Sequence, residues 1–286
     1  MKLDGRWLGV LCLVAWSCAG PAQTGVGLRS QAVSANDAGY QYYLQGRWNL
    51  AEEKFSQALR ANRLMDDRQG IALNLNNLGA IYQERGELKE AEVRYREALE
   101  IHRELGDSGG LCQTLNNLGA LYQAQGKLKE AQETYQEALG YAGMLPPGPL
   151  YTLTLTHLGD AARARGDFGA ALALYNQALE QDQARRDRKG MAVRIQRLGR
   201  TYLAMKEYPQ AGLYLRQALT EFRRLEDTGG IVDALEGLTL LALAQDDREE
   251  AWNYGGRLLK LYQARGQGQE AKKLEALLSK RPGGNP

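Results

Sequence analysis

The chain has 286 residues, with 36 basic and 34 acidic side chains and a formal net charge of +2. So balanced a charge gives no general reason to expect binding to nucleic acid or to an anionic membrane surface. Two of the three cysteines, Cys12 and Cys18, lie near the N-terminus. Cys112 would be alone in a processed chain, which excludes an intrachain disulfide there.

Residues 1–19 have the pattern of an export signal. Two basic residues precede an apolar run from Trp7 to Trp16, which is short for a membrane span, and small residues follow. Cleavage after Ala19 fits the small-residue rule for signal removal. Lipidation of Cys18 is an open alternative, and an uncleaved segment packed on the folded chain is a third. We therefore predict an exported protein of the periplasm or cell envelope, held at a membrane only if Cys18 carries a lipid.

The central part of the chain is a repeat with a period of forty residues. Residues 75–91 recur nearly unchanged as residues 115–131. After a predicted linker at 20–31, six copies follow one another without an insertion over residues 32–271. A fixed period of this length is typical of a repeat array. One small-residue position shows the phase in every copy: Ala51, Ala91, Ala131, Ala171, Ala211 and Ala251.

Each copy has the spacing of two helices. In the second copy, Leu75, Leu78 and Tyr82 recur at three- and four-residue intervals, as on the apolar side of a helix. Gly86 interrupts the run, and a second helix is predicted to begin near Leu88. One such hairpin cannot bury its apolar side alone, but stacked neighbours can. The pattern predicts an all-α array of six helix-turn-helix hairpins, a single continuous body.

These residues resemble the tetratricopeptide repeat, which has Leu-Gly with a tyrosine three residues later, a glycine near the turn, and then alanine, an aromatic residue and alanine. The forty-residue form is similar to the long-helix variant of kinesin light chains and many bacterial proteins. The resemblance implies a right-handed α-solenoid. The fourth copy has Ala162 in place of the tyrosine, and the sixth lacks both the glycine and the aromatic residue. We expect those two copies to pack less regularly.

Most junctions between copies carry an aspartate followed three residues later by a glycine, at Asp67, Asp107, Asp187 and Asp227. The aspartate is predicted to cap the next helix and the glycine to end the previous one. The junction at Pro146–Pro149 differs, because its prolines must stop a helix early, and we expect a stiff elbow between the first three copies and the rest. Residues 272–280 are predicted to form an amphipathic capping helix, and residues 281–286 a disordered tail.

Sequence signals for catalysis are scarce. The two histidines, His102 and His157, belong to different predicted helices, and the chain has no HExxH, no CxxC, no phosphate-cradling glycine loop and no nucleophile elbow. A sugar or cell-wall enzyme would need an acid pair, and none can be named. His102 is interpreted as a solvated residue of a charged helix face, and Cys112 as a small packing residue. We therefore predict a protein that is not an enzyme and that uses no cofactor or metal.

The candidate binding positions lie on the first helices, whose inner side lines the concave face of such arrays. The front copies have asparagine before Leu-Gly and glutamine farther along, where the rear copies have histidine and arginine. Asparagine can pair with a peptide backbone of any sequence, and arginine suits carboxylates. The predicted partner-binding residues are Asn76, Asn77, Gln83, Asn116, Asn117, Gln123, His157, Arg163, Arg197 and Arg200.

An alternative applies to one asparagine of each pair. Adjacent helix positions point about 100° apart, so one amide of each pair could bridge neighbouring helices instead of facing a ligand. The resemblance implies that the asparagine next to Leu-Gly contacts the backbone of the ligand. That implication favours Asn77 and Asn117 as the contact residues.

The function predicted from these positions is that of a scaffold that binds a peptide or a partner protein in its concave groove. An acidic or carboxylate group on that partner would suit the rear arginines. Nucleic acid is not expected as a partner. The alternative is an envelope assembly factor of the pilus or secretion type, acting through self-association or through the convex face. Light scattering at increasing protein concentration would distinguish the two.

Overall fold

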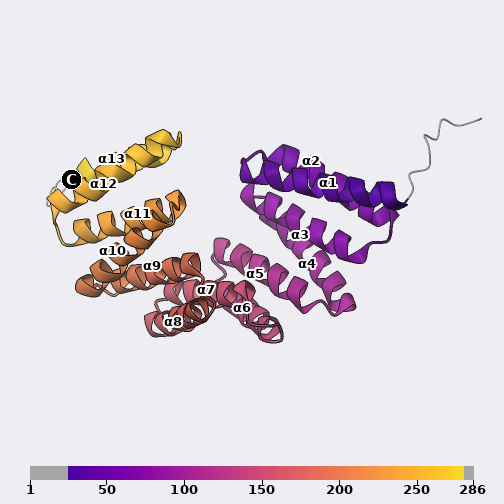
Figure 1. Cartoon of the computed structure of the whole chain (residues 1–286), viewed down its shortest axis with the longest axis horizontal. Coiled ribbons are helices and arrows are strands. Elements are labelled where there is room, and N and C mark those ends of the chain that lie inside the picture. The colour runs from indigo at the N-terminus through magenta and orange to yellow at the C-terminus, as the bar shows by residue number, and fades with distance from the viewer. Residues whose placement is uncertain (1–24, 280–286) are drawn as a thin grey trace, which may run out of the picture.

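The computed structural model describes residues 25–279, and this part of the chain consists of helices without strands. Twelve of the helices form six hairpins, and each hairpin packs on the next along a curved path (Figure 1). This confirms the all-α solenoid. The helices are α1 (Gly25–Leu44), α2 (Trp48–Leu64), α3 (Arg68–Glu84), α4 (Leu88–Leu105), α5 (Ser108–Ala124), α6 (Leu128–Gly143), α7 (Pro149–Ala164), α8 (Phe168–Ala184), α9 (Arg188–Ala204), α10 (Tyr208–Arg224), α11 (Thr228–Ala244), α12 (Arg248–Ala264) and α13 (Gly268–Ser279).

A residue with a left-handed backbone conformation closes the turn inside each hairpin. In the first four hairpins that residue is a glycine, with a φ of 77° at Gly86 and 75° at Gly126. Glycine adopts this conformation without a Cβ clash, which explains why the helical pattern is interrupted there. The last two hairpins place Lys206 (φ 64°) and Asp246 (φ 56°) in the same position.

The aspartates at the junctions cap the helices that follow them, as the sequence predicts. The Asp107 carboxylate accepts a hydrogen bond from the backbone N–H of Gly110 at 2.9 Å, and its counterparts at three other junctions make the same bond. The prediction for the glycine is wrong, because Gly110 lies in the first turn of the next helix instead of ending the previous one. Its missing Cβ leaves room for His102 of the preceding helix.

The second, third and fourth hairpins each pack a tyrosine ring against the glycine of Leu-Gly. Tyr95, Tyr135 and Tyr175 are at most 1% exposed. A Cβ placed on Gly119 would lie 2.6 Å from the nearest atom of the Tyr135 ring. Interiors packed this closely leave no space for an added methyl group, so these hairpins require glycine at this position. Leu215 takes the place of the ring in the fifth hairpin.

We predict that Gly119→Ala destabilises the protein by about 1–3 kcal/mol, because the added methyl group must displace a buried ring. Urea unfolding measures this change. Gly140→Ala is the matched control, since a Cβ on Gly140 meets nothing within 4 Å and alanine favours the helix. A Gly119→Ala protein as stable as the wild type would contradict the close packing.

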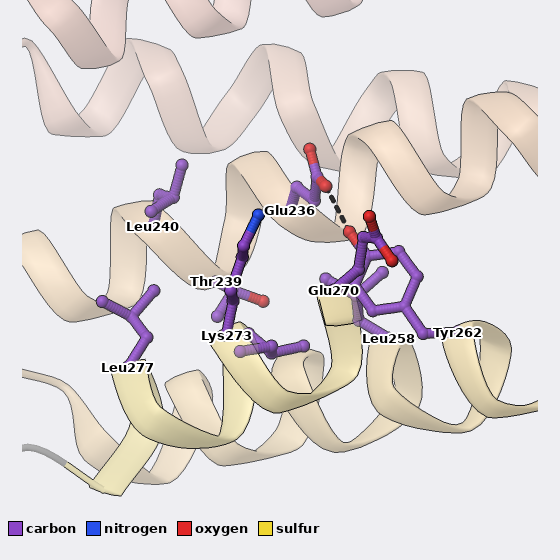
Figure 2. A pocket seen from close by; sticks show the side chains of 9 residues that line it. Glu236, Thr239, Leu240, Leu258, Tyr262, Glu270, Lys273 and Leu277 are labelled. Carbon is purple, nitrogen blue, oxygen red and sulfur yellow. Dashed lines mark hydrogen bonds between the residues drawn. The ribbon is translucent and has the colours of Figure 1, made fainter. Parts of the chain in front are cut away.

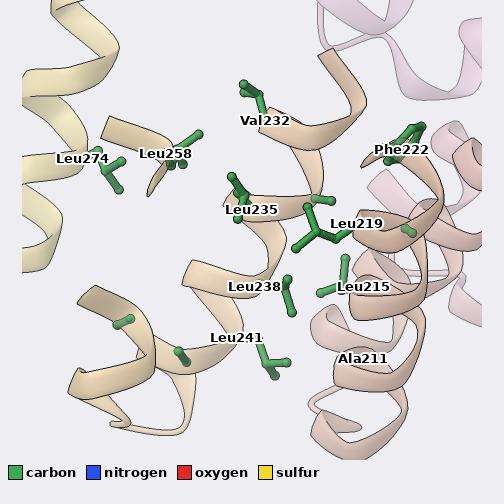
Figure 3. Packing of buried hydrophobic residues seen from close by; sticks show 14 of the residues in the cluster. Ala211, Leu215, Leu219, Phe222, Val232, Leu235, Leu238, Leu241, Leu258 and Leu274 are labelled. Atoms are coloured by element: carbon green, nitrogen blue, oxygen red, sulfur yellow. The ribbon is translucent and has the colours of Figure 1, made fainter. Parts of the chain in front are cut away.

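The largest apolar cluster joins the fifth and sixth hairpins to α13. Leu215 and Leu219 of α10 face Leu238 of α11 in the part of this cluster drawn in Figure 3. The expected irregular packing is therefore not found in the sixth hairpin, where Leu278 of α13 lies against Gly255, the position of the missing ring. The buried residues of the fourth hairpin are, by contrast, divided between two clusters of only four buried residues each.

The prolines between the third and fourth hairpins end a helix without interrupting the stack. α6 ends at Gly143 and α7 begins at Pro149, and the two helices pack on each other. Across the loop, Nδ2 of Asn116 in α5 donates a hydrogen bond to Oγ1 of Thr154 in α7 at 2.8 Å. The expected elbow is therefore a longer turn between hairpins that remain in direct contact.

Both ends of the described region differ from the predicted boundaries. Residues 25–31, predicted as part of the linker, extend α1, because no proline interrupts them. α13 begins at Gly268, four residues before the predicted start of the capping helix at 272. It buries Leu274 and Leu278, which are 7% and 3% exposed, and thereby covers the end of the array.

Several predictions fall on residues that the structure does not describe. The export signal at 1–19, Cys18 and the tail at 281–286 lie outside residues 25–279. Among the helices that are described, none has both the length and the apolar character needed to cross a membrane.

Candidate functional site

The candidate site is the surface formed by the first helices of the hairpins. Figure 1 shows the array as an arc, with α5 and α7 on its inner side and α6 and α8 on its outer side. Because α3 contacts α5 and α5 contacts α7, equivalent positions form a row across the hairpins. Asn77, Asn117, His157 and Arg197 occupy one such row at forty-residue intervals, and all four are half-buried.

Amide hydrogen bonds link the first helices of the front hairpins. Nδ2 of Asn77 donates to Oδ1 of Asn36, and Nδ2 of Asn117 donates to Oδ1 of Asn76, both at 3.1 Å. Asn76 and Asn116 are only 4% and 2% exposed. These two predicted contact residues therefore bridge helices inside the array, which is the alternative raised by the sequence.

Asn77 and Asn117 are the members of each pair that reach the surface. Their amide N–H groups are held by the preceding hairpin, and neither Oδ1 has a hydrogen-bond partner among residues 25–279. Gln83 and Gln123 lie farther along the same helices and accept hydrogen bonds from the buried tyrosine of their own hairpin, at 3.2 Å and 3.5 Å. The front half therefore presents carbonyl oxygens in fixed positions.

Of the rear arginines, Arg163 and Arg197 share the Asp160 carboxylate, whereas Arg200 pairs with a different carboxylate. Arg163 and Arg197 lie 3.8 Å and 3.4 Å from the Asp160 carboxylate, and Arg200 lies 2.9 Å from that of Glu236. The predicted basic cluster is therefore a set of ion pairs. The sequence carried part of this signal, because Asp160 precedes Arg163 by three residues on the same side of one helix.

Two aromatic residues belong to the rear half of this surface: His157 in the row itself and Tyr175 of α8 beside it. Tyr175 donates a hydrogen bond to Asp160 at 2.7 Å, and burial, followed by the charge of Asp160, raises the pKa of Tyr175 above its ordinary value. His157 stacks on Tyr135, with ring centroids 5.4 Å apart. Burial lowers the pKa of His157 against the opposing effect of Asp160. His157 is therefore a stacked ring whose burial disfavours the charged form, rather than a member of a cationic cluster.

Two cavities lie beside the first helices. One of about 410 Å³ lies between α3, α4 and α5, and most of the residues that line it are polar. The other, of about 310 Å³, lies between α11, α12 and α13 and includes Leu240, Leu258 and Leu277 in its wall (Figure 2). At its edge the Tyr262 hydroxyl donates a hydrogen bond to Glu236, which holds the ring in place.

The polar cavity includes His102, which the sequence predicted to be solvated. His102 is 6% exposed and lies against Gly110, so its interpretation as a solvated residue is wrong. Cys112 is fully buried, 3.4 Å from the Thr154 hydroxyl, as expected of a packing residue. Within the described residues, no three His, Cys, Asp or Glu side chains gather in the manner of a metal site.

The stacked hairpins, with equivalent positions in a row on their first helices, define the protein as a helical repeat protein. The tetratricopeptide repeat family profile matches residues 30–104, 70–143 and 110–184. These segments together span more than half of the chain, and the chain belongs to the tetratricopeptide repeat family. No curated protein sequence matches the chain.

Solved structures with the same fold are distant in sequence. BtubC from P. vanneervenii is 21% identical with a TM-score of 0.61, and the match covers 91% of this chain and 94% of that one. A putative kinesin light chain repeat protein from Podospora anserina is 20% identical with a TM-score of 0.57, covering 72% and 99%. A Rap protein complexed with Competence and Sporulation Factor is 14% identical with a TM-score of 0.65, covering 90% and 75%. At these identities the similarity establishes the fold alone.

Proposed function

We propose that this protein binds an extended peptide segment of a partner protein along the inner surface of the array and catalyses no reaction. Tetratricopeptide arrays are protein-interaction scaffolds, and the chain belongs to that family. The observation that carries the proposal is the pair of surface asparagines, Asn77 and Asn117, with anchored amide groups and open oxygens. Packed helices lie about 8–10 Å apart, close to the span of three residues of an extended chain.

Charge contributes little to this binding, for a structural reason. A carboxylate on the peptide would meet arginines that are already paired with Asp160 and Glu236. Exposed ion pairs contribute about 1 kcal/mol or less, and a shared guanidinium contributes no more. The open oxygens of the front half are therefore the stronger basis for recognition. The Rap protein solved with a bound factor supports a ligand-binding role for this fold.

The proposal is tested by measuring partner affinity in variants of the inner surface. Asn117→Ala should weaken binding by about 1 kcal/mol with little change in salt dependence, because it removes a neutral hydrogen-bond acceptor. The combined change Arg197→Gln and Arg200→Gln should weaken binding more at low salt than at high salt, since exposed charges are screened. The partner is captured by cross-linking and pulldown from the native envelope and then titrated calorimetrically at two salt concentrations.

A variant on the outer surface provides the control. Leu213 is 62% exposed on α10, and Leu213→Ser should leave partner affinity unchanged. If the inner-surface variants bind like the wild type while Leu213→Ser abolishes binding, the inner surface is not the site.

A second candidate function rests on apolar side chains exposed on second helices. Val93 of α4, Leu213 of α10 and Trp252 of α12 are 51%, 62% and 52% exposed. We propose as the alternative that such surfaces hold the protein in an envelope assembly through self-association. Light scattering would then show a particle mass that grows with concentration. A constant monomer mass would reject self-association.

The proposed location follows from residues 1–19, which lie outside the described residues. We propose that the protein is exported to the periplasm or cell envelope, with Cys18 as the candidate lipid attachment residue. Cys18→Ser should release a lipidated protein from the membrane fraction. Wild-type protein found free in the periplasm would instead support simple cleavage.

A further inference from the structure

The polar cavity of about 410 Å³ between the second and third hairpins has an acidic wall. It is formed by the beginnings of α3 and α5 and the end of α4. Asp67 and Asp107, the capping residues of α3 and α5, both line it. Three amides, a histidine and a hydroxyl contribute further polar groups: Gln69, Asn76, Gln113, His102 and Thr114.

A later junction of the same chain shows which groups can occupy this place. Eighty residues after His102 and Thr114, the equivalent positions hold Asp182 and Arg194. Nε of Arg194 lies 3.2 Å from Oδ2 of Asp182, and Nη2 of Arg185 lies 2.6 Å from its Oδ1. At that junction, therefore, the chain places two of its own guanidinium groups against the carboxylate.

Both guanidinium groups are missing at the earlier junction. Thr114 and Leu105 stand at the positions of the two arginines, whereas the capping aspartate is retained as Asp107. His102 is 6% exposed, and its Nδ1 lies 2.9 Å from Oδ2 of Asp107 without the alignment of a hydrogen bond. This buried nitrogen has no hydrogen-bond partner among the described residues. The earlier junction therefore keeps the capping aspartate, has His102 in place of Asp182, and has no arginine at either position.

We propose that this cavity is a subsite for a guanidinium group, supplied by an arginine side chain of the bound peptide. A guanidinium carries five N–H donors in one plane and no acceptor, which suits a wall of carboxylate and amide oxygens. Leu73 and Gln113 line the cavity and precede Asn77 and Asn117 by four residues, so a peptide held by those asparagines passes its opening. The identity of the peptide rests on the proposed function, but the subsite can be tested by itself.

The sign of the ligand charge follows from the helix caps. The N-terminal ends of α3 and α5 by themselves would favour an anion. Each end is already capped by an aspartate, however, and within residues 25–279 neither carboxylate lies within ion-pair distance of a lysine or arginine. The cavity wall therefore holds two carboxylates, one of them beside the His102 ring, and no lysine or arginine, which favours a cation.

The subsite is tested with a small probe. The probe is Nα-acetyl-L-arginine amide, and the uncharged citrulline derivative is its control. Because the chain has only two histidines, the His102 ring signals in a proton NMR spectrum are assigned by comparison with His157→Gln. We expect the arginine derivative to shift these signals with a dissociation constant on the order of millimolar. The citrulline derivative should bind roughly tenfold more weakly, because it makes no charge-assisted hydrogen bonds.

Three variants locate the binding. Asp107→Asn keeps a helix cap but removes a negative charge, and it should weaken arginine binding roughly tenfold. Asp187→Asn makes the same change at the later junction and should leave the binding unchanged. Thr114→Arg supplies the missing guanidinium from within the chain and should abolish binding. If Thr114→Arg does not fold, as judged by circular dichroism, the comparison of the two asparagine variants decides.

The results that would overturn the subsite are distinct from those that would overturn the groove. Equal binding of the arginine and citrulline derivatives, or equal weakening by Asp107→Asn and Asp187→Asn, rejects the subsite. Asn117→Ala should weaken binding of the captured partner while leaving the arginine derivative bound. Partner binding that is insensitive to Asn117→Ala rejects the groove alone.

Discussion

Replacing Asp182 by alanine should destabilise the protein by about 3–5 kcal/mol, because it leaves a buried guanidinium without its partner. Asp182 is 0% exposed and Arg194 is 7% exposed, with 3.2 Å between the carboxylate and Nε of the arginine. Arg185 loses the same carboxylate, but it is more exposed and lies 3.6 Å from Asp187. Urea unfolding followed by circular dichroism measures the loss.

The next junction supplies the matched control for this prediction. Phe222 and Ala234 occupy the positions equivalent to Asp182 and Arg194, and Phe222 packs against the junction glycine as Asp182 does. The double change Asp182→Phe and Arg194→Ala should therefore restore most of the stability, since apolar groups often replace a buried ion pair without loss. An Asp182→Ala protein as stable as the wild type would contradict the burial of this pair.

Tyr135→Ala should also destabilise the protein by about 3–5 kcal/mol, the usual cost of removing a large aromatic side chain from a core. The ring is 0% exposed, packs on Gly119 and stacks on His157 of the next hairpin. Its cluster contains only four buried residues, so little apolar material can move into the space left behind. We expect a lower urea midpoint and faster hydrogen exchange in α5, α6 and α7 than in the last two hairpins.

Tyr135→Phe separates the packing of the ring from its hydroxyl. The hydroxyl donates to Oε1 of Gln123 at 3.5 Å, which is long for a hydrogen bond. Its removal should therefore cost about 1 kcal/mol or less. Exchange that becomes faster to the same extent along the whole array in Tyr135→Ala would contradict a local effect.

The fold could be predicted from the sequence wherever the copies agree. The forty-residue phase placed the hairpins, and the aspartates at the junctions identified the helix caps, because equivalent residues make equivalent contacts in each copy. Where the copies differ, the forty-residue period does not predict whether a side chain is buried. His102 occupies a position held by asparagine, alanine and aspartate in neighbouring copies, and Arg103 and Glu104 beside it suggested a solvated helix face. Its burial depends on the close approach of Gly110 from the next hairpin.

The candidate site was predictable in its positions but not in its charges. Asn77, Asn117 and Arg197 fall in one row because the row follows the period. Asp160, which pairs with Arg197, comes from another hairpin, and such a pair depends on side-chain directions that spacing along one helix does not give. Within each asparagine pair, by contrast, the 100° between adjacent helix positions already predicted that the two amides would differ in their surroundings.

The buried side chains differ from one junction to the next, and this difference affects which hairpins can stack on each other. Copies as similar as these could stack on the wrong neighbour, or on a hairpin of a second chain, while the protein folds. If Asp182 met Ala234 instead of Arg194, the buried carboxylate would keep Arg185 but lose the guanidinium of Arg194, which would make the wrong stack less stable. Each junction therefore accepts its own neighbour and disfavours exchange, so the side chains that distinguish the copies also fix their sequence in space.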